Sequence, residues 1–300
     1  MENKQNYPTT KEKYQEMVNQ FVSQLEQGTA PWTKSWMSGG LPKNFASGNQ
    51  YNGMNILTLM NQGFNDNRFL TFNQVKKLGG SVKKGEKSAP IFFMKPIEKE
   101  TVDDGGEKHI EKYFVMQSYQ VFNIEQTDGI EYDKHINPKK NEVLSEAQEF
   151  IDTVKEDIPE FAGSPAYSVT DDCIFMPDIN RFEDSFNYYS TYFHELSHAT
   201  GHPKRLNRED KQLSKFGDPK YAYEELIAEL SSSFLCSDLK VPMDTTRHTE
   251  YLSSWVTALK EKPNILFSAA SQASKSTNFL KEMVQTKKQE KTKTFSPKLR

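Results

Sequence analysis

The sequence predicts an α+β protein of two domains, because a half with both helical and strand patterns is followed by a half with mainly helical patterns. Its 300 residues exceed the usual length of one domain, and 35% of them are hydrophobic, which is enough for a sizeable core. The first half mixes helical and strand patterns, whereas the second half is mainly helical. We therefore expect a domain over residues 8–125, a linker over 126–141, a second domain over 142–286 and a basic disordered tail over 287–300.

The first half begins with a helical pattern. Apolar and aromatic residues recur at helical spacing from Lys11 to Leu25, and Gly28 with Pro31 ends that helix. Two shorter helices are expected at 55–60 and 71–78, the second with a threonine cap. Aromatic and β-branched runs around the DDGGEKH turn then predict antiparallel strands. These strands are expected at 90–94, 112–117 and 119–123.

The second half is read as one strand among helices. An apolar helical face runs from Val143 to Ile158, and Asp172 to Met176 has the pattern of a strand that Pro177 ends. Further helices are expected near 184–200, 220–236, 249–260 and 264–284. This half is therefore predicted to be mainly helical.

A string of residues typical of a zinc site lies in the expected helix near 184–200. His194 and His198 are four positions apart in FHELSH, so both imidazoles lie on one face of a helix. Glu195 is offset from that face, where its carboxylate can reach a water on the zinc and act as general base. The pattern predicts one Zn²⁺ per chain and a catalytic role for Glu195.

A catalytic zinc needs a third protein ligand, and several residues compete for that place. Lys204 stands where the longer H-E-x-x-H-x-x-G-x-x-H pattern has its third histidine, which excludes that class. His202 lies beyond Gly201, past the end of the helix. The next helix offers Glu225 as ligand and Glu229 as the carboxylate that orients a histidine. Glu224 and Glu229 remain alternatives for the ligand.

The first half also has the composition of a surface for single-stranded nucleic acid. Proteins that hold single strands without reading sequence combine cationic side chains for phosphates with aromatic rings for bases. The segment from Arg68 to Lys95 holds seven Lys/Arg and one Glu. We expect DNA contacts from Trp32, Lys34, Trp36, Lys43, Asn49, Tyr51, Arg68, Lys83, Lys84 and Lys87.

Other features limit the class of protein. No window approaches the run of about 18 apolar residues of a membrane span, and the first residues lack the apolar region of a signal peptide. Cys173 and Cys236 are the only cysteines, which is too few for a disulfide framework. We expect both to be buried, reduced thiols and the protein to be cytoplasmic.

With these residues in view, the chain resembles the ArdC antirestriction family over nearly its whole length. In the first half the resemblance lies in PWTKSW (31–36), SGNQYNGMN (47–55), KKGEKSAPIFF (83–93) and VFNIEQTDG (121–129). In the second half it lies in YSVTDDCIFMP (167–177), YFHELSHATGHPKRL (192–206) and EELIAEL (224–230). The matching strings stand in the same order as in the family.

The resemblance implies an N-terminal domain for single-stranded DNA and a C-terminal zincin-like metallopeptidase domain of the HExxH-plus-glutamate type. It also implies a protein that shields the incoming DNA of a mobile element from restriction. Three hypotheses follow: an antirestriction protein with a working peptidase and an unidentified protein substrate, a DNA-binding shield whose zinc is purely structural, and a DNA-activated protease of DNA-bound proteins.

Overall fold

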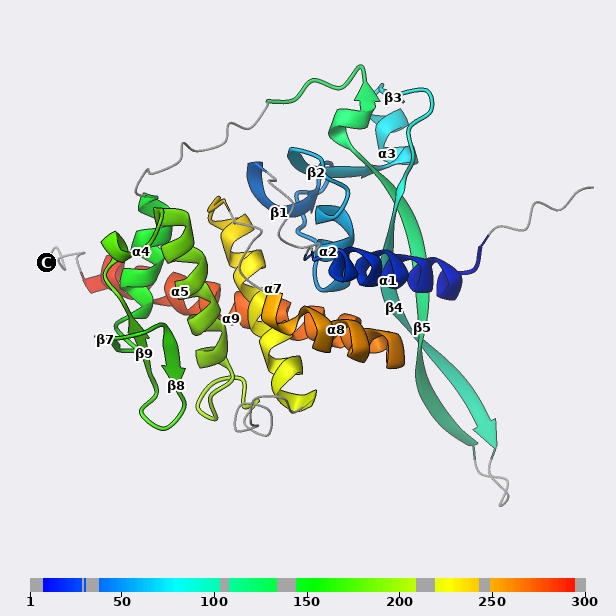
Figure 1. Ribbon diagram of the computed structural model, residues 1–300. Helices are drawn as coiled ribbons and strands as arrows, with labels where there is room; N and C mark the ends of the chain where they lie inside the picture. Colours follow the sequence, from blue (N-terminus) through cyan, green and yellow to red (C-terminus); the bar gives the residue numbers. More distant parts are fainter. Residues whose placement is uncertain are drawn as a thin grey trace, which may run out of the picture.

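The fold mixes helices and strands in two connected parts, which confirms the predicted α+β class (Figure 1). The computed structural model describes residues 8–28, 30, 38–102, 108–133, 144–208, 219–242 and 249–294. The predicted linker lies partly outside these residues, because its segment 134–141 is not described.

A mixed four-stranded sheet forms the centre of the first half, in the order β1-β2-β5-β4. The strands are β1 Ser38–Asn44, β2 Asp66–Thr71, β4 Ala89–Val102 and β5 Lys108–Asn123. β4 and β5 pair antiparallel along their whole lengths, so the two runs expected at 112–117 and 119–123 are one strand. β1 was not among the strands expected from the sequence. It lies at the sheet edge, parallel to β2, where Pro42 does not interrupt a central strand.

The described part of the first half has three helices, and the threonine cap that was expected for the third is present. They are α1 Thr10–Glu26, α2 Met54–Met60 and α3 Phe72–Lys77. Thr9 caps α1 and Thr71 caps α3, each in a reciprocal capping box with the residue three positions on. Beyond them, β3 Ser81–Val82 pairs with β6 Thr127–Asp128, which follows the 3-10 turn Ile124–Gln126.

The second half places its helices against a small sheet of order β7-β9-β8. Its strands are β7 Glu160–Ala162, β8 Ala166–Ser168 and β9 Cys173–Met176, and the 3-10 turn Ile179–Arg181 follows. Its helices are α4 Ser145–Val154, α5 Ser185–Thr200, α7 Pro219–Asp238, α8 Thr249–Glu261 and α9 Asn264–Thr294. The strand expected near 172–176 is β9. The three-residue strands β7 and β8 are too short to show an alternating pattern.

The larger hydrophobic core joins the two halves. It contains Phe21 of α1 and Leu57 of α2 together with Phe234 of α7, Trp255 of α8 and Ala270 of α9. α8 lies beside α1, and α7 and α9 run behind them (Figure 1). We expected two domains with separate cores, but the apolar faces of α7, α8 and α9 also cover the first half. A second core lies between α4, α5 and the small sheet.

The tail from Lys287 was expected to be disordered, and this was wrong as far as Thr294, where α9 ends. Lysines on its last turns pair with acids in α4 and just after it. Lys287 Nζ lies 2.9 Å from Asp157 and 3.2 Å from Glu156, and Lys288 Nζ lies 2.8 Å from Glu149. These pairs favour continued helix, which composition alone did not predict.

Two simpler expectations concern the cysteines and the membrane. Cys173 and Cys236 are buried and form no disulfide, as predicted. Among the described residues, every helix is too short or too polar to cross a membrane.

Candidate metal centre

Two packed helices carry the candidate metal ligands. Asp184 caps α5 by accepting a hydrogen bond from the backbone N–H of Asn187 at 2.8 Å. The helix then runs unbroken through the HELSH segment to Thr200. α7 packs along α5, so the acidic face of the second helix meets the histidine face of the first.

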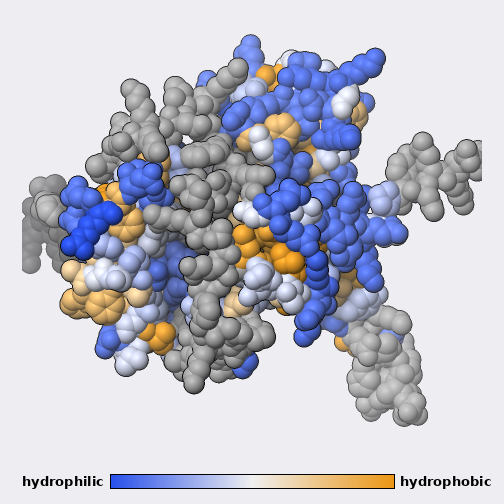
Figure 2. Space-filling view, viewed as in Figure 1, coloured by the Kyte–Doolittle hydropathy of each residue, from blue (hydrophilic) through white to orange (hydrophobic). Residues whose placement is uncertain are grey.

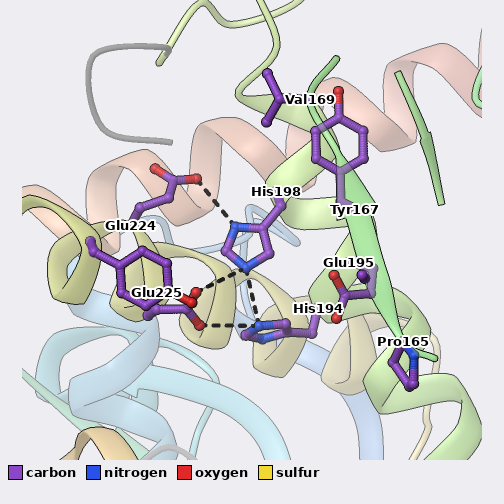
Figure 3. Close-up of a pocket in the computed structure, with 10 residues that line it drawn as sticks. Pro165, Tyr167, Val169, His194, Glu195, His198, Glu224 and Glu225 are labelled. Carbon is purple, nitrogen blue, oxygen red and sulfur yellow. Dashed lines mark hydrogen bonds and ion pairs between the residues drawn. The ribbon is translucent and has the colours of Figure 1, made fainter. Parts of the chain in front are cut away.

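The side chains of His194, His198 and Glu225 converge on one point (Figure 3). The two Nε2 atoms of the histidines are 3.2 Å apart. The carboxylate oxygens of Glu225 lie 3.4 Å from His194 Nε2 and 3.5 Å from His198 Nε2. Among the described residues, these three form the group of donors that could hold a metal ion, with ligand atoms within 4.8 Å of one another.

These spacings are short enough for a shared metal ion. Zinc binds nitrogen and carboxylate oxygen at about 2.0–2.1 Å, so neighbouring ligands of a tetrahedron lie about 3.4 Å apart. The two Nε2 atoms, 3.2 Å apart, are close to that value, and each lies 3.4 or 3.5 Å from a different oxygen of Glu225. Two imidazoles and one carboxylate also leave a fourth position open, as in catalytic zinc sites. The residues present therefore fit the metal.

Two further carboxylates contact the other ring nitrogens of the histidines. Glu229 lies 3.6 Å from His194 Nδ1, and Glu224 lies 3.7 Å from His198 Nδ1. Such carboxylates fix the orientation of metal-binding imidazoles. Of the three glutamates that the sequence left open, Glu225 is the one at the common point, and Glu224 and Glu229 stand behind the histidines.

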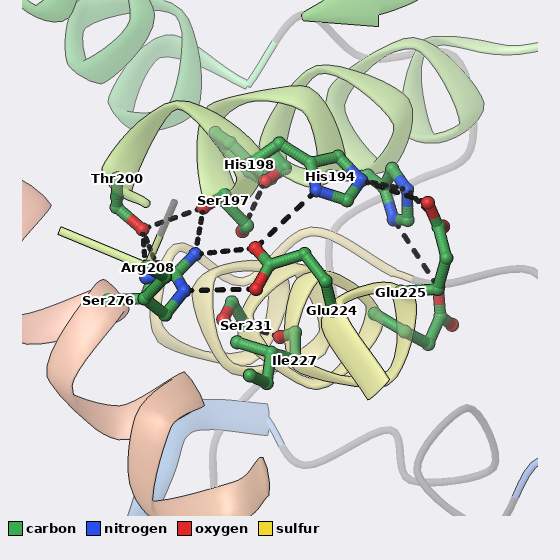
Figure 4. A network of polar contacts seen from close by, with 12 residues as sticks. His194, Ser197, His198, Thr200, Arg208, Glu224, Glu225, Ile227, Ser231 and Ser276 are labelled. Atoms are coloured by element: carbon green, nitrogen blue, oxygen red, sulfur yellow. Dashed lines mark hydrogen bonds and ion pairs between the residues drawn. The ribbon is translucent and has the colours of Figure 1, made fainter. Parts of the chain in front are cut away.

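A buried arginine holds Glu224 in place (Figure 4). Arg208 donates to both carboxylate oxygens of Glu224, at 2.9 and 3.2 Å, and also to the backbone carbonyl of Ser197. A fourth donation from Arg208 reaches Thr200 Oγ1, which lies 2.7 Å from Ser276 Oγ of α9. The network thus joins α5, α7 and α9 behind the histidines. No local sequence pattern points to Arg208, because its partners lie on two other elements, α5 and α7.

The electrostatics of the site favour charged carboxylates. Burial alone would raise the pKa of Glu225, but the hydrogen bond with His194 and the nearby imidazoles lower it to about 2. Burial alone would lower the pKa of His194, yet Glu225 and Glu229 raise it well above its ordinary value. The pKa of Glu224 is lowered, because His198 and Arg208 outweigh its burial. The acids therefore stay ionised and present negative charge to a cation.

Glu195 lies in the same cavity as the three donors, which has a volume of about 340 Å³ (Figure 3). It is 8% exposed and has no ion-pair partner among the described residues. The opposite wall comes from β8 and the loop after it, with Tyr167 and Val169, and Tyr221 of α7 completes the lining. Sequence reasoning missed both tyrosines, because aromatic residues in a chain are most often core.

His202 is held outside the donor group by a neighbouring polar cluster. Its Nδ1 accepts a hydrogen bond from the backbone N–H of Lys204 at 3.3 Å and lies 3.6 Å from Asp172. Arg205 donates to Asp172 and, at 3.1 Å, to the hydroxyl of Tyr167. This cluster ties the loop after α5 to the turn before β9 and positions the β8 wall of the cavity.

The expected DNA contacts of the first half have mixed outcomes. Trp32, Lys34 and Trp36 lie outside the described residues. Tyr51 is 8% exposed and belongs to the core, so its ring is not an open stacking platform. Arg68 is 13% exposed and pairs with Asp66 at 2.7 Å, so it is held within the protein rather than offered to phosphate. Both side chains are largely covered, because exposure depends on packing between distant segments, and their DNA contacts stay predictions; Tyr51 lines a cavity together with Asn49.

The remaining members of that set are accessible. Asn49, Lys83, Lys84 and Lys87 are exposed, and Lys43 is half-buried. Residues around β2, α3 and β3 give a largely hydrophilic face (Figure 2).

Comparisons with known proteins agree along the whole chain. Residues 11–122 match the family described as the N-terminal domain of anti-restriction factor ArdC, and residues 145–272 match the zincin-like metallopeptidase family. The metal-free crystal structure of the antirestriction protein ArdC from plasmid R388 is 33% identical, with a TM-score of 0.75, over 91% of this chain and 98% of that one. The Mn(II)-bound structure of the R388 protein is 31% identical, with a TM-score of 0.70, over 90% of this chain and 97% of that one.

Longer relatives share the same region. A DNA primase TraC of Escherichia coli is 34% identical over 93% of this chain, which spans 20% of the primase. An uncharacterized protein, y4eC, of Sinorhizobium fredii is 30% identical over 87% of this chain and 88% of its own length. With an N-terminal match, a zincin-like match and a full-length structural match that all agree, the chain belongs to the ArdC antirestriction family.

Proposed function

We propose that this chain is an antirestriction protein of a mobile element that binds single-stranded DNA and hydrolyses peptide bonds at a zinc centre. The observation that carries the hydrolytic half is the convergence of His194, His198 and Glu225, whose ligand atoms lie within 4.8 Å of one another, in one cavity with Glu195. The nucleic-acid half rests on family membership and on the exposed lysines near α3 and β3.

Zinc is the metal that these donors favour. Imidazole nitrogens with a single carboxylate are typical zinc ligands, whereas Mg²⁺ and Ca²⁺ prefer oxygen alone. The Mn(II)-bound R388 structure supports a divalent cation in the family. When bound, zinc would polarise a carbonyl group and lower the pKa of water.

The protein's own residues would then carry the remaining steps. Glu195 is placed to accept a proton from the attacking water and to pass it to the leaving amine. Glu224 and Glu229 keep the two imidazoles oriented through their Nδ1 atoms. The buried position of Glu195 limits competition from bulk water.

The shape of the cavity favours a peptide as substrate. β8 pairs with β9 on one side and has no second strand partner among the described residues. Pro165, Ala166 and Tyr167 at this edge also line the cavity. An extended peptide can add to such an edge through backbone hydrogen bonds, which would place a scissile carbonyl near the donors.

The test compares metal content and cleavage in the same set of variants. Elemental analysis should find about one zinc per wild-type chain and per Glu195→Gln chain, because Glu195 is not a ligand. His198→Ala should lose the metal, whereas the matched control His202→Asn should keep it. A quenched-fluorescent peptide library, with and without a single-stranded oligonucleotide, then measures cleavage.

Glu195→Gln should lose about 10²- to 10⁴-fold in cleavage rate while it keeps its zinc, because only the general base is removed. If wild type cuts nothing with DNA present, or if Glu195→Gln cuts as fast as wild type, the peptidase half is wrong. If His198→Ala keeps its zinc, the assignment of the metal ligands is wrong.

A second candidate function is a DNA-binding shield with a structural zinc. A metal held by His194, His198 and Glu225 would cross-link α5 and α7. The neighbouring hydrogen bonds that join Arg208 to Glu224 and Thr200, and Thr200 to Ser276 of α9, favour this function, because α7 and α9 also pack against the first half. In that case zinc removal would lower the melting temperature, and protection of DNA would be unchanged in Glu195→Gln.

A further inference from the structure

Two adjoining cavities form a trench on the side of the sheet that meets α9. The larger, of about 620 Å³, runs between the loop after β1, the start of α3 and strands β4 and β5. The smaller, of about 290 Å³, continues between the loop before α2 and α9. The two share Asn52, Asn55 and Phe92 in their walls, so they meet. This trench is separate from the metal cavity, with which it has no lining residue in common.

The floor of the trench is rigid. Asn55 donates to the carbonyl of Phe92 at 2.8 Å and accepts from its N–H at 2.7 Å, so both the nitrogen and the oxygen of its carboxamide are bonded to strand β4. Asn44 and Gln74 exchange hydrogen bonds at 3.0 and 3.2 Å. These amides hold the loop, α3 and the sheet together and leave little freedom for the walls to collapse.

The rim of the trench, in contrast, carries exposed carboxamide groups that are available to a ligand. Asn49, Asn52 and Asn278 are exposed, and among the described residues their side chains have no hydrogen-bond partner. Each carboxamide presents a donor and an acceptor side by side, which matches the edge of an unpaired base.

Two exposed aromatic rings stand at the same rim. Phe93 is 46% exposed and Tyr119 is 50% exposed, and their ring centroids lie 5.7 Å apart at 72°. They come from neighbouring strands, and both line the larger cavity. Large exposed rings beside a cavity are typical of platforms on which bases stack.

The charge of the trench suits a polyanion. Neither cavity is lined by a carboxylate, although 41 of the 300 residues are acidic. The one charged residue in either lining is Lys275, which is exposed and has no ion pair within the described part of the chain. A phosphate could therefore approach the α9 end without repulsion from nearby acids.

We infer that the trench binds unpaired bases of single-stranded nucleic acid. Bases stack on Phe93 and Tyr119, Asn49 and Asn52 contact their edges, and Lys275 contacts a phosphate at the far end. This inference rests on the proposed function, the binding of single-stranded DNA, and adds where on the protein the strand binds. It moves the stacking role from the core residue Tyr51 to two residues of the β4–β5 hairpin.

The experiment measures fluorescence anisotropy of a labelled single-stranded oligodeoxynucleotide of mixed sequence. Phe93→Ala and Tyr119→Ala should each weaken binding by about 5- to 150-fold, the loss of one stacked base. Tyr119→Phe keeps the ring and should keep the affinity. The matched controls Phe114→Ala and Tyr113→Ala remove rings that are 63% and 44% exposed on the same hairpin but outside the trench, and they should bind like wild type.

An abasic oligonucleotide of the same length separates bases from phosphates. Wild type should bind it more weakly than the normal strand, and Tyr119→Ala should reduce that difference, because only bases can stack. Thermal melting checks that each variant is folded.

The outcomes distinguish this inference from the function on which it rests. If wild type binds the oligonucleotide and all four alanine variants bind equally well, the trench is not the site, but the proposed DNA binding stands. If wild type does not bind at all, the DNA half of the proposed function is wrong. If the trench variants lose binding of a peptide probe instead, the occupant has been misassigned.

Discussion

The metal cavity and the trench differ in how their residues are brought together. Three donor atoms of the metal cavity come from two packed helices and lie within 4.8 Å of one another. The trench draws its residues from a loop, from α3, from two strands and from α9, and its contact groups are exposed. The metal cavity therefore depends on a few largely buried side chains, whereas the trench would bind its ligand through many exposed side chains.

This difference predicts different responses to substitution. A buried charged group has lost its contact with water, so it depends on one or two protein partners. An exposed group keeps its water when a partner is removed. Single substitutions of charged groups should therefore change stability strongly next to the metal cavity and only slightly on the exposed surface of the first half.

The largest effect is expected for Arg208→Met. The change leaves the buried carboxylate of Glu224 without its two donated hydrogen bonds, so stability should fall by about 3–5 kcal/mol. Zinc affinity should also fall, by about 10- to 100-fold, because Glu224 no longer holds His198 in position. Urea denaturation and competition with a chelator measure the two quantities.

A matched surface pair sharpens this comparison. Lys112 and Glu98 pair at 3.0 Å on the β4–β5 hairpin, where their side chains are 69% and 60% exposed. Lys112→Met should cost less than about 1 kcal/mol. Adding Glu224→Gln to Arg208→Met should recover part of the loss, because it removes the unpaired charge. Equal losses for Arg208→Met and Lys112→Met would refute the contrast between the two regions.

An intermediate effect is expected for Asp172→Asn. Burial alone would raise the pKa of Asp172, but Arg205 and Tyr167 donate to it and lower that pKa below its usual 3.8. A lowered pKa in the folded state adds stability above the unfolded pKa, and this stability is lost as pH falls through the folded value. Asparagine tolerates the left-handed backbone at this position, where φ is 52°, so the substitution removes mainly the charge.

The variant should be less stable than wild type by about 1.5–3 kcal/mol at pH 7, the range for hydrogen bonds to charged groups. The difference should begin to shrink below about pH 4, where this aspartate becomes protonated in the unfolded chain, and should shrink further as pH falls through the lowered pKa of the folded protein. Thermal melts from pH 3 to pH 7 test this. A difference that stays constant over that range would mean that the charge of Asp172 does not stabilise the fold.

The same contrast explains what the sequence could predict. Helical spacing converts positions i and i+4 into neighbours, so the FHELSH string alone placed His194 and His198 on one face. The acidic face of the next helix narrowed the third donor to three glutamates. Sequence reasoning preferred Glu225, but setting aside Glu224 and Glu229 as ligands needed the packing of α5 against α7, which no local pattern contains.

The surface of the first half depends on longer-range information. Phe93 and Tyr119 meet because β4 and β5 pair in one register, with Phe93 opposite Gln117 and Ile91 opposite Tyr119. Tyr51 and Arg68 were expected to contact DNA on the basis of residue type, which does not reveal whether a side chain is exposed. Tyr51 is covered by the shared core, and Arg68 by Asp66 beside it and by the rings of Phe45 and Tyr132.

The smallest effects are expected for single lysines near α3 and β3. Lys84→Gln and Lys87→Gln should each reduce the log–log salt slope of oligonucleotide binding by about 0.7, which corresponds to one phosphate contact on a single strand. Each should weaken affinity only modestly, because many other contacts remain. Lys240→Gln is the control, since Lys240 is exposed near α4 and pairs with Glu146. A slope that stays at the wild-type value in both test variants would mean that this basic segment is a solvated face, and phosphate contacts would then have to be sought nearer to Lys275.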